Sequence, residues 1–133
     1  MKLSIGTAQF GFKYGICNKE GIVSQQQVGK IIQFCKSKKI YFIDTAQGYG
    51  KSHKILGSLN IENFKITTKI SNIKKNNIKD LENYVNLEID KILDELKLNK
   101  IYAILIHDTS QLKGKFGKNF YKVLKNIKKK KKF

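Results

Sequence analysis

The stretch YFIDTAQGYGKS, residues 41–52, decides how the rest of the chain is interpreted. It begins as a short apolar strand, ends that strand at Asp44, and turns through two glycines into a helix. Tyr49 lies in the turn, five residues after the aspartate. An acid at the end of a strand with a phenol just beyond it is typical of acid–base chemistry. A phosphate-binding loop and a plain capped turn are the two alternatives.

The phosphate-loop alternative rests on Gly50-Lys51-Ser52, which opens a helix after a strand as the end of G-x-x-x-x-G-K-[ST] does. That motif requires a glycine at position 45, where this chain has Thr45. Without that glycine the loop loses the backbone freedom that lets amide groups surround a phosphate. The sequence therefore disfavours a phosphate loop.

Apolar runs and helical periodicity predict four strands that alternate with four helices. The strands are expected at 3–7, 40–43, 64–70 and 101–106, and residues 8–21 form a loop. The helices are expected over about 13 residues after the N-cap Ser24, at 51–59, at 78–98, and around 116–127. The second strand is apolar throughout, which indicates burial on both faces. The predicted class is α/β, built from parallel (β/α) units.

Each predicted strand ends close to a polar side chain: Thr7, Asp44, Lys69 and His107. The carboxyl ends of parallel strands lie on one edge of a sheet, so these side chains are expected to converge there. Singly, each has a plain structural explanation, such as a helix cap, a solvated lysine or a core histidine. Together they predict a site in which the Lys69 charge favours the Tyr49 phenolate, and Asp44 holds Lys69.

The net charge of +17 raises nucleic-acid binding as an alternative. All 27 basic residues are lysine, however, whereas arginine dominates bidentate recognition of phosphates and bases. Residues 111–133 hold ten of these lysines and no acid, so the excess charge is concentrated near the end of the chain. Nucleic-acid binding is therefore not the favoured interpretation.

Length, cysteines and hydropathy limit the remaining classes. The chain of 133 residues is long enough for one hydrophobic core, and its two cysteines form no disulfide framework. The first residues lack the apolar run of a signal peptide, and no stretch reaches transmembrane length. We expect a cytoplasmic protein with no membrane partner and no bound metal.

At this point the motifs resemble those of the aldo-keto reductase family. Residues 44–52 with Leu56-Gly57 resemble the signature D-T-A-x-x-Y-G-x-S-E-x-x-L-G, except that His53 stands where the signature has glutamate. Residues 66–69 (ITTK) resemble the strand with the catalytic lysine, and residues 105–108 (LIHD) resemble the strand with the catalytic histidine. Gly6-Thr7-Ala8 resembles the end of the first strand, which borders the nicotinamide in that family.

The resemblance implies NADPH-dependent reduction of an aldehyde or ketone to an alcohol. Tyr49 would protonate the carbonyl oxygen with help from Lys69 and Asp44, and His107 would orient the substrate. The residues implied at the cofactor are Gly6, Thr7, Ala8 and Asp44. The form of the loop at residues 6–11 (GTAQFG) is similar to relatives in surface-sugar biosynthesis, which indicates a sugar-like substrate.

The family fold is a TIM-type (β/α)8 barrel of roughly 250 residues, and this chain carries about four such units. We expect a half-barrel domain over 1–127, a lysine-rich tail over 128–133, and an incomplete NADPH site. The favoured hypothesis is a truncated, weakly active or inactive fragment, because the five lysines at 128–132 indicate an adenine-rich stretch prone to frame slips. Two alternatives are self-association through open barrel edges and a basic nucleic-acid- or anion-binding module that uses the tail.

Overall fold

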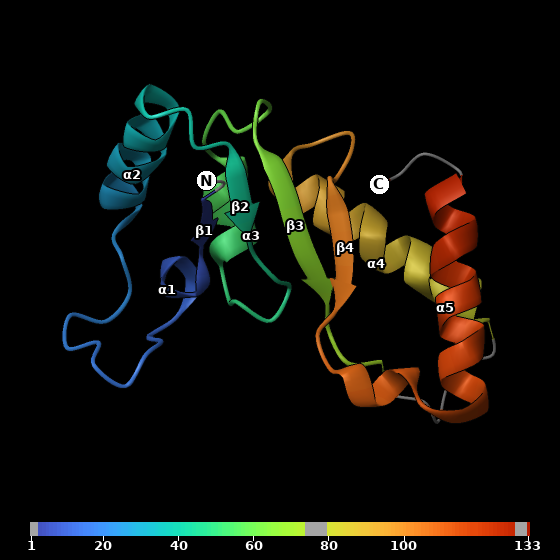
Figure 1. Cartoon of the computed structure of the whole chain (residues 1–133). Helices are drawn as coiled ribbons and strands as arrows, with labels where there is room; N and C mark the ends of the chain where they lie inside the picture. Colours follow the sequence, from blue (N-terminus) through green and yellow to red (C-terminus); the bar gives the residue numbers. More distant parts are fainter. Residues whose placement is uncertain (1–2, 74–79, 130–132) are drawn as a thin grey trace.

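The protein is described here by a computed structural model covering residues 3–73, 80–129 and 133. Strands and helices alternate along the chain, as predicted (Figure 1). The strands are β1 Ser4–Gly6, β2 Phe42–Asp44, β3 Lys65–Ile70 and β4 Ala103–Ile106. The helices are α1 Ala8–Gly11, α2 Gln25–Ser37, α3 Ser52–Gly57, α4 Leu81–Leu96, the 3-10 helix η2 Thr109–Leu112, and α5 Gly114–Lys129.

The four strands form one sheet in the order β1-β2-β3-β4, and every pair is parallel. Gly6 is level with Asp44, Asp44 with Thr67, and Thr67 with Ala103. This arrangement confirms the predicted α/β class and matches half of a (β/α)8 barrel. Because the strands are parallel, all four carboxyl ends lie on the same edge of the sheet.

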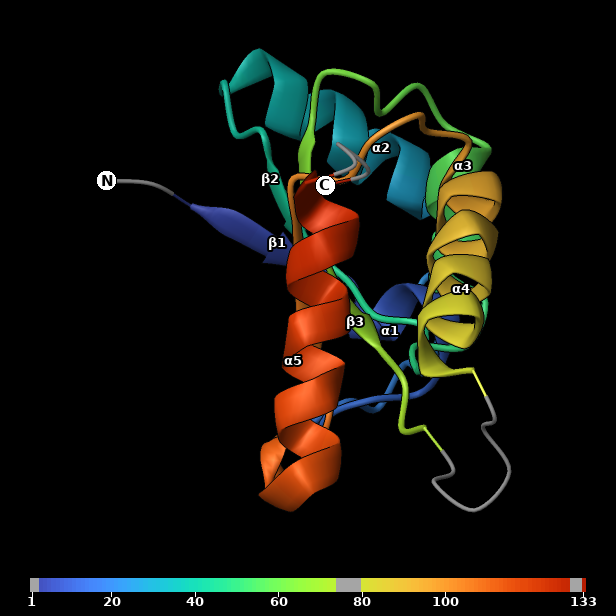
Figure 2. The ribbon, with the colours of Figure 1, turned by 90° about the vertical axis from the view of Figure 1, so that its right-hand side faces the viewer.

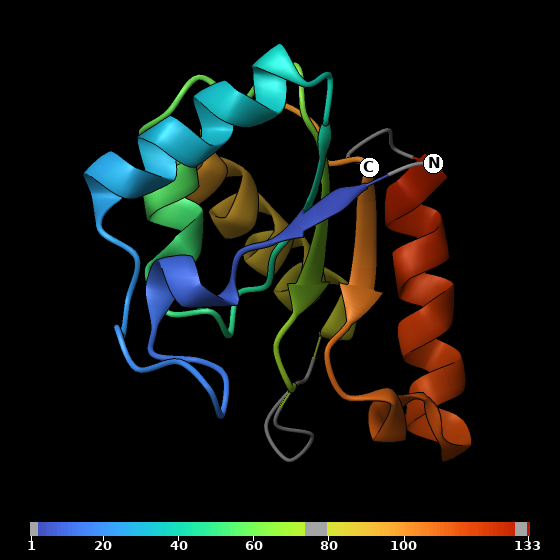
Figure 3. The ribbon, with the colours of Figure 1, turned by 60° about the vertical axis from the view of Figure 1, so that its left-hand side comes forward.

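One face of the sheet is covered by helices and the other is open. Figure 2 shows α3 and α4 together on one side of the sheet, and Figure 3 shows α2 and α5 at opposite flanks. Ile43 and Ile66 point into the covered side and are almost fully buried. Phe42 and Leu105 lie on the other face, where Phe42 is half-buried and Leu105 is exposed. The prediction that the second strand is buried on both faces is therefore wrong, because only one face of the described sheet has helices packed on it.

The long helices begin and pack as their sequences indicate. The Ser24 side chain accepts a hydrogen bond from the Gln27 amide at the start of α2, and Asp80 caps α4 through the Asn83 amide. The predicted apolar stripe of α4 is buried throughout, at Leu81, Val85, Ile89, Ile92 and Leu96. Residue 78, where that helix was predicted to begin, lies outside the described residues.

Two segments differ from the sequence predictions. The predicted loop at 8–21 begins with the short helix α1, whose Phe10 side chain joins the core. The last helix, α5, continues through Lys129, two residues into the predicted tail. Its buried side chains include Phe120 and Ile127, so the apolar face of this lysine-rich helix is used for packing. None of the helices within the described residues has the length and hydropathy needed to cross a membrane.

Candidate active site

Lys69 is the centre of the polar cluster at the carboxyl edge of the sheet. Its Nζ donates hydrogen bonds to Asp44 Oδ1 at 2.5 Å and to the Tyr49 hydroxyl at 3.3 Å. A third hydrogen bond goes to the Thr45 carbonyl oxygen at 3.1 Å. Strand β3 supplies the lysine, β2 supplies the aspartate, and the turn after β2 supplies the tyrosine. Sheet register thus joins groups that lie 20 to 25 residues apart in sequence.

The electrostatics of this cluster keep Lys69 charged. Burial of the ammonium opposes its charge, but the hydrogen bonds that it donates to Asp44 and Tyr49, together with the Asp44 charge, outweigh that effect. The pKa of Lys69 is therefore raised above its ordinary value of 10.5. Its Nζ also lies 5.0 Å from the centre of the Tyr49 ring. A fixed positive charge beside the phenol is what stabilises a phenolate.

His107 directly follows β4, and its ring contacts the ring of Tyr49. The two rings meet edge to face, with their centres 6.1 Å apart and an angle of 83° between the planes. A Cβ at residue 48 would lie 3.3 Å from the His107 ring. Because residue 48 is glycine, the imidazole has room beside it. His107 remains exposed, so it is accessible at this edge of the sheet.

A close contact between two backbone segments holds the turn that carries Tyr49. A Cβ at Gly11 would fall 1.6 Å from the Tyr49 carbonyl oxygen. Gly50 has φ +55°, and a Cβ there would fall 2.5 Å from the Gly11 carbonyl oxygen. The sequence identifies Gly11 as a turn residue. In the structure it ends α1 and is packed against the tyrosine turn, a role that depends on a segment about 40 residues away.

Three buried hydroxyl groups form a hydrogen-bonded network that links the ends of β1 and β2 to the start of α3. Ser52 Oγ donates to Thr7 Oγ1 at 2.9 Å and lies 3.2 Å from Thr45 Oγ1. Thr7 Oγ1 donates in turn to the Asp44 carbonyl oxygen at 3.1 Å. All three threonine and serine side chains have no exposed surface. Ser52, the last residue of the run Gly50-Lys51-Ser52 that resembles a phosphate loop, is therefore buried in a hydrogen-bonded network next to Asp44.

His53 occupies the position of the signature glutamate and is the residue whose role the sequence left undefined. It is 2% exposed, with Nε2 3.0 Å from Thr68 Oγ1 and Nδ1 3.4 Å from Glu95 Oε2. Burial lowers the pKa of His53, and Glu95 offsets part of that effect. Thr68 is the strand neighbour of Lys69, so His53 ties α3 and α4 to the strand that carries the lysine.

Two glutamines connect the loops at this edge, and the sequence carried no signal for either. Gln47 accepts a hydrogen bond from the Ser71 amide at 2.9 Å and donates to Glu88 Oε2 at 2.6 Å. Gln111 bonds both backbone groups of Ile73, at 3.1 and 2.9 Å. These side-chain amides fasten the turns after β2 and β4 to the segment after β3. Their partners become evident only from the fold.

The edge above β1 has the shape expected for part of a cofactor site. Gly6 is exposed, and a Cβ at this position would meet no atom within 4 Å, so the sheet face there is unobstructed. Ala8 is half-buried beside it, and Asp44 is level with Gly6 on the next strand. The Thr7 side chain instead points into the hydroxyl network and presents no exposed surface. The surface beside Gly6 is therefore unobstructed, and no cluster of metal ligands occurs among the described residues.

The profile of the aldo/keto reductase family matches residues 2–132, so the chain belongs to that family. The crystal structure of PA4992, a candidate aldo-keto reductase from Pseudomonas aeruginosa, is similar with a TM-score of 0.74 and 22% identity over 96% of this chain and 51% of that one. A second structure of a candidate aldo-keto reductase from the same organism gives 0.73 and 21%, over 97% and 50%.

A candidate 2,5-diketo-D-gluconic acid reductase B is more distantly similar, with a TM-score of 0.51 and 19% identity over 78% of this chain and 32% of that chain. At these identities the structural similarity concerns the fold alone. The comparison with curated proteins finds no match. The chain spans about half the length of the two Pseudomonas structures.

Proposed function

We propose that this chain carries the proton-donating half of an NADPH-dependent reductase of aldehydes or ketones. The observation that carries the proposal is the hydrogen-bonded series Asp44–Lys69–Tyr49, with His107 against the tyrosine ring. Membership of the aldo/keto reductase family supports it. The series places a charged ammonium against a phenol at the edge of the sheet where substrates collect in (β/α) folds.

Reduction of a carbonyl group requires a hydride at carbon and a proton at oxygen. NADPH, when bound, supplies the hydride. The Tyr49 hydroxyl donates its proton to the substrate oxygen and becomes a phenolate. Lys69 stabilises that phenolate with its charge, and Asp44 holds the ammonium within hydrogen-bonding reach of the tyrosine.

His107 positions the substrate in this proposal. Its exposed ring, edge-on to Tyr49, can donate a hydrogen bond to the same carbonyl oxygen that receives the tyrosine proton. Two donors on one oxygen fix its direction and stabilise the negative charge that develops there. The nicotinamide end of the cofactor would lie along Gly6, Ala8 and Asp44, with Thr7 supporting the strand from below. A sugar-like carbonyl compound is the substrate class that the loop at residues 6–11 favours.

The described residues provide the nicotinamide end of the site, and the pyrophosphate and adenosine parts have no counterpart among them that we can assign. We therefore propose weak NADPH binding and slow turnover for the chain as given. Titration of the chain with NADPH, followed by cofactor fluorescence, measures the binding affinity. An affinity in the micromolar range would contradict the proposal that the cofactor site is incomplete.

The chemical assignment is tested by carbonyl-dependent NADPH oxidation at high protein concentration, with a panel of aldoses and simple aldehydes. Tyr49→Phe should abolish the rate and leave cofactor affinity unchanged, because only the proton donor is removed. Tyr102→Phe is the matched control, since that phenol lies at the opposite end of the strands. A rate unaffected by Tyr49→Phe would exclude the proposed mechanism, and loss of cofactor binding would show that Tyr49 has another role.

A further inference from the structure

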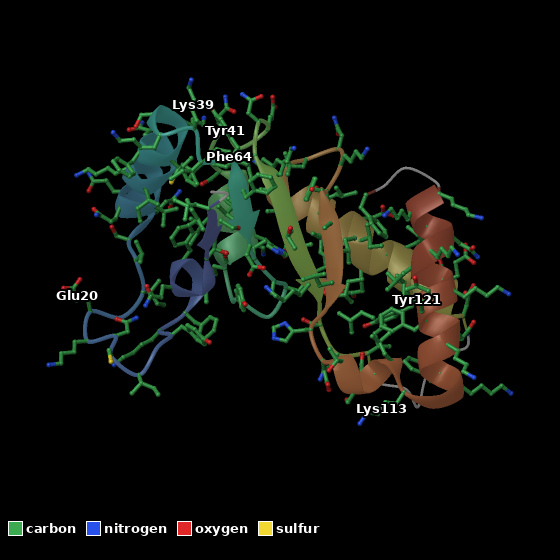
Figure 4. The ribbon with its side chains drawn as sticks, in the orientation of Figure 1. Glu20, Lys39, Tyr41, Phe64, Lys113 and Tyr121 are labelled. Atoms are coloured by element: carbon green, nitrogen blue, oxygen red, sulfur yellow. The ribbon has the colours of Figure 1, made fainter. Side chains whose placement is uncertain are left out.

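The outer edge of β4 and the helix α5 enclose an apolar groove of about 940 Å³. Leu105, Leu112 and Tyr121 line it while remaining 46%, 41% and 62% exposed. Tyr121 reaches it from α5, where Figure 4 labels the side chain. Within the described sheet β4 pairs with β3 alone, so the groove lies beside a strand edge that can accept a further strand.

The opposite edge of the same sheet has matching properties. β1 pairs only with β2 among the described strands, and Leu3, directly before it, is 51% exposed. β1 has 3 residues and β4 has 4, so the two edges are of similar length. Ser4 and Leu105 both lie on the open face of the sheet, because Ser4 is level with Phe42, Phe42 with Lys65, and Leu105 with Lys69.

We propose that the groove is the docking site for β1 of a second copy of this chain. Strand β1 of each copy would lie parallel to β4 of the other, related by a two-fold axis along the barrel axis. Two sheets of four parallel strands then close into one of eight, and both open edges are satisfied at once.

The open face of the sheet provides a second reason for this occupant. Phe42 and Leu105 lie on that face without a helix layer over them, and Tyr102, 56% exposed, has its ring 5.7 Å from that of Phe42. In the closed dimer this face becomes the interior of the barrel, where apolar side chains from facing strands pack in layers. Pairing at the edges and burial of this face are therefore gained in the same step. The inference does not depend on the proposed reductase chemistry.

Charge gives the association a distinctive salt dependence. Lys125, Lys128 and Lys129 line the groove, and each chain carries a net charge of +17. Two copies repel one another at long range, so added salt should strengthen their association by screening. An acidic peptide in the same groove would show the opposite dependence, because salt weakens the attraction between unlike charges.

Sedimentation equilibrium of the chain at low and high sodium chloride tests this directly. We expect a monomer–dimer equilibrium whose dissociation constant falls about tenfold as salt is raised. A chain that remains monomeric at high concentration in high salt, with native circular dichroism, would overturn the proposal. Dimers that dissociate as salt is raised would also overturn it and indicate an interface of opposite charges.

Paired leucine variants locate the interface. Leu105→Glu, in the groove, should raise the dissociation constant at least about tenfold, because a charge would be buried against the partner. Leu87→Glu is the matched control, since Leu87 is 59% exposed on α4, away from both sheet edges. Equal effects of the two substitutions would exclude the groove as the interface.

Disulfide trapping decides the outcome even if the glutamate variant fails to fold. In a background with Cys17→Ser, which removes the exposed thiol, one chain carries Ser4→Cys and a tagged chain carries Ala103→Cys or Leu105→Cys. Neighbouring strands bring such positions within disulfide range, so oxidation should link the mixed pair. Chains that each carry Ser4→Cys alone should not cross-link. Absence of mixed dimers from both combinations would refute the proposed pairing.

Discussion

Lys65 and Lys69 lie on the same face of β3, four residues apart, and have different surroundings. The Lys65 ammonium lies over two aromatic rings, 5.3 Å from the centre of Phe42 and 5.4 Å from that of Tyr102. The Lys69 ammonium is 2.5 Å from a carboxylate oxygen and 3.3 Å from a phenol. Lys65 is exposed, whereas the Lys69 side chain is only 18% exposed. The same residue type covers apolar surface at one end of the strand and forms a charged site at the other.

The two ends of the sheet differ in the same way. Tyr41 and Phe64, labelled in Figure 4, pack edge to face at the amino end with their ring centres 5.6 Å apart. At the carboxyl end, Lys69 and His107 contact Tyr49 instead. Parallel strands produce this division, because they bring all the turns that follow them to one edge.

The largest difference should appear in catalysis. Lys69→Met should lower carbonyl-dependent NADPH oxidation at least about 100-fold, the usual contribution of a positioned acid–base group. Lys65→Met should leave the rate unchanged, because its ammonium lies over Phe42 and Tyr102, at the opposite end of β3 from Lys69. Both variants are assayed at the same high protein concentration. Similar losses in the two variants would mean that the open face as a whole, and not the carboxyl end, supports activity.

The backbone contact beneath Tyr49 should be the next most sensitive feature. Gly11→Ala should lower the free energy of unfolding by about 3 kcal/mol, since the new methyl group would overlap the Tyr49 carbonyl. Gly6→Ala is the control, because the space around its Cβ is empty and the change should stay within about 0.5 kcal/mol. Urea denaturation measures the free energy of unfolding of the two variants. Equal stabilities would show that the turn can move away from α1.

The buried histidine behind β3 should make stability depend on pH. Burial lowers the pKa of His53 in the folded protein, so the unfolded chain takes up a proton first as pH falls. Stability is therefore complete above the ordinary value of 6.5 and is lost progressively as pH falls below it. Thermal unfolding between about pH 7.5 and pH 5 should show this decline, and His53→Gln should flatten it. An identical decline in the variant would assign the effect to other groups.

The pKa of Lys69 offers a direct measure of its partnership with Asp44. That pKa is raised in the native chain because hydrogen bonds to Asp44 and Tyr49 outweigh desolvation. Asp44→Asn should lower it, since the carboxylate charge is lost while burial remains. A titration of the lysine Cε signals by NMR, with Lys69→Met to assign the resonance, measures the change. An unchanged value would show that Tyr49 alone supports the charge.

The smallest effect should come from the amino end of β3. Lys65→Met should lower the free energy of unfolding by about 0.5 to 1 kcal/mol through the lost cation–π contacts. Lys30→Met, at an exposed position of α2, serves as a surface lysine control. Denaturation at low and high salt separates the two contributions, because contact with the rings should persist when surface charges are screened. If Lys65→Met lowers the free energy of unfolding more than Gly11→Ala does, the amino end of the sheet matters more for stability than the contact beneath Tyr49, contrary to this proposal.

Local patterns identified most of the elements and the residues at the strand ends. Helical periodicity predicted α2, in which Val28, Ile32 and Cys35 form the buried stripe, and Ser24 marked its start. Polar residues after apolar runs identified Asp44, Lys69 and His107, because a parallel sheet turns sequential positions into one edge. Short elements were less well predicted. α1 was missed, since a four-residue helix has too few turns to show a periodic pattern.

What the sequence determined by itself was the order of parallel units, the family motifs and the residues of the polar edge, because each depends on neighbours within a few positions. Only the tertiary structure decided which face of β2 is covered, why Gly11 must lack a side chain, and what surrounds His53. These properties arise from contacts between segments that are distant along the chain, such as Gly11 with Tyr49 and His53 with Glu95. The same physical reason separates Lys65 from Lys69. The two are chemically identical in sequence, and the partners that the fold brings to each give them different roles.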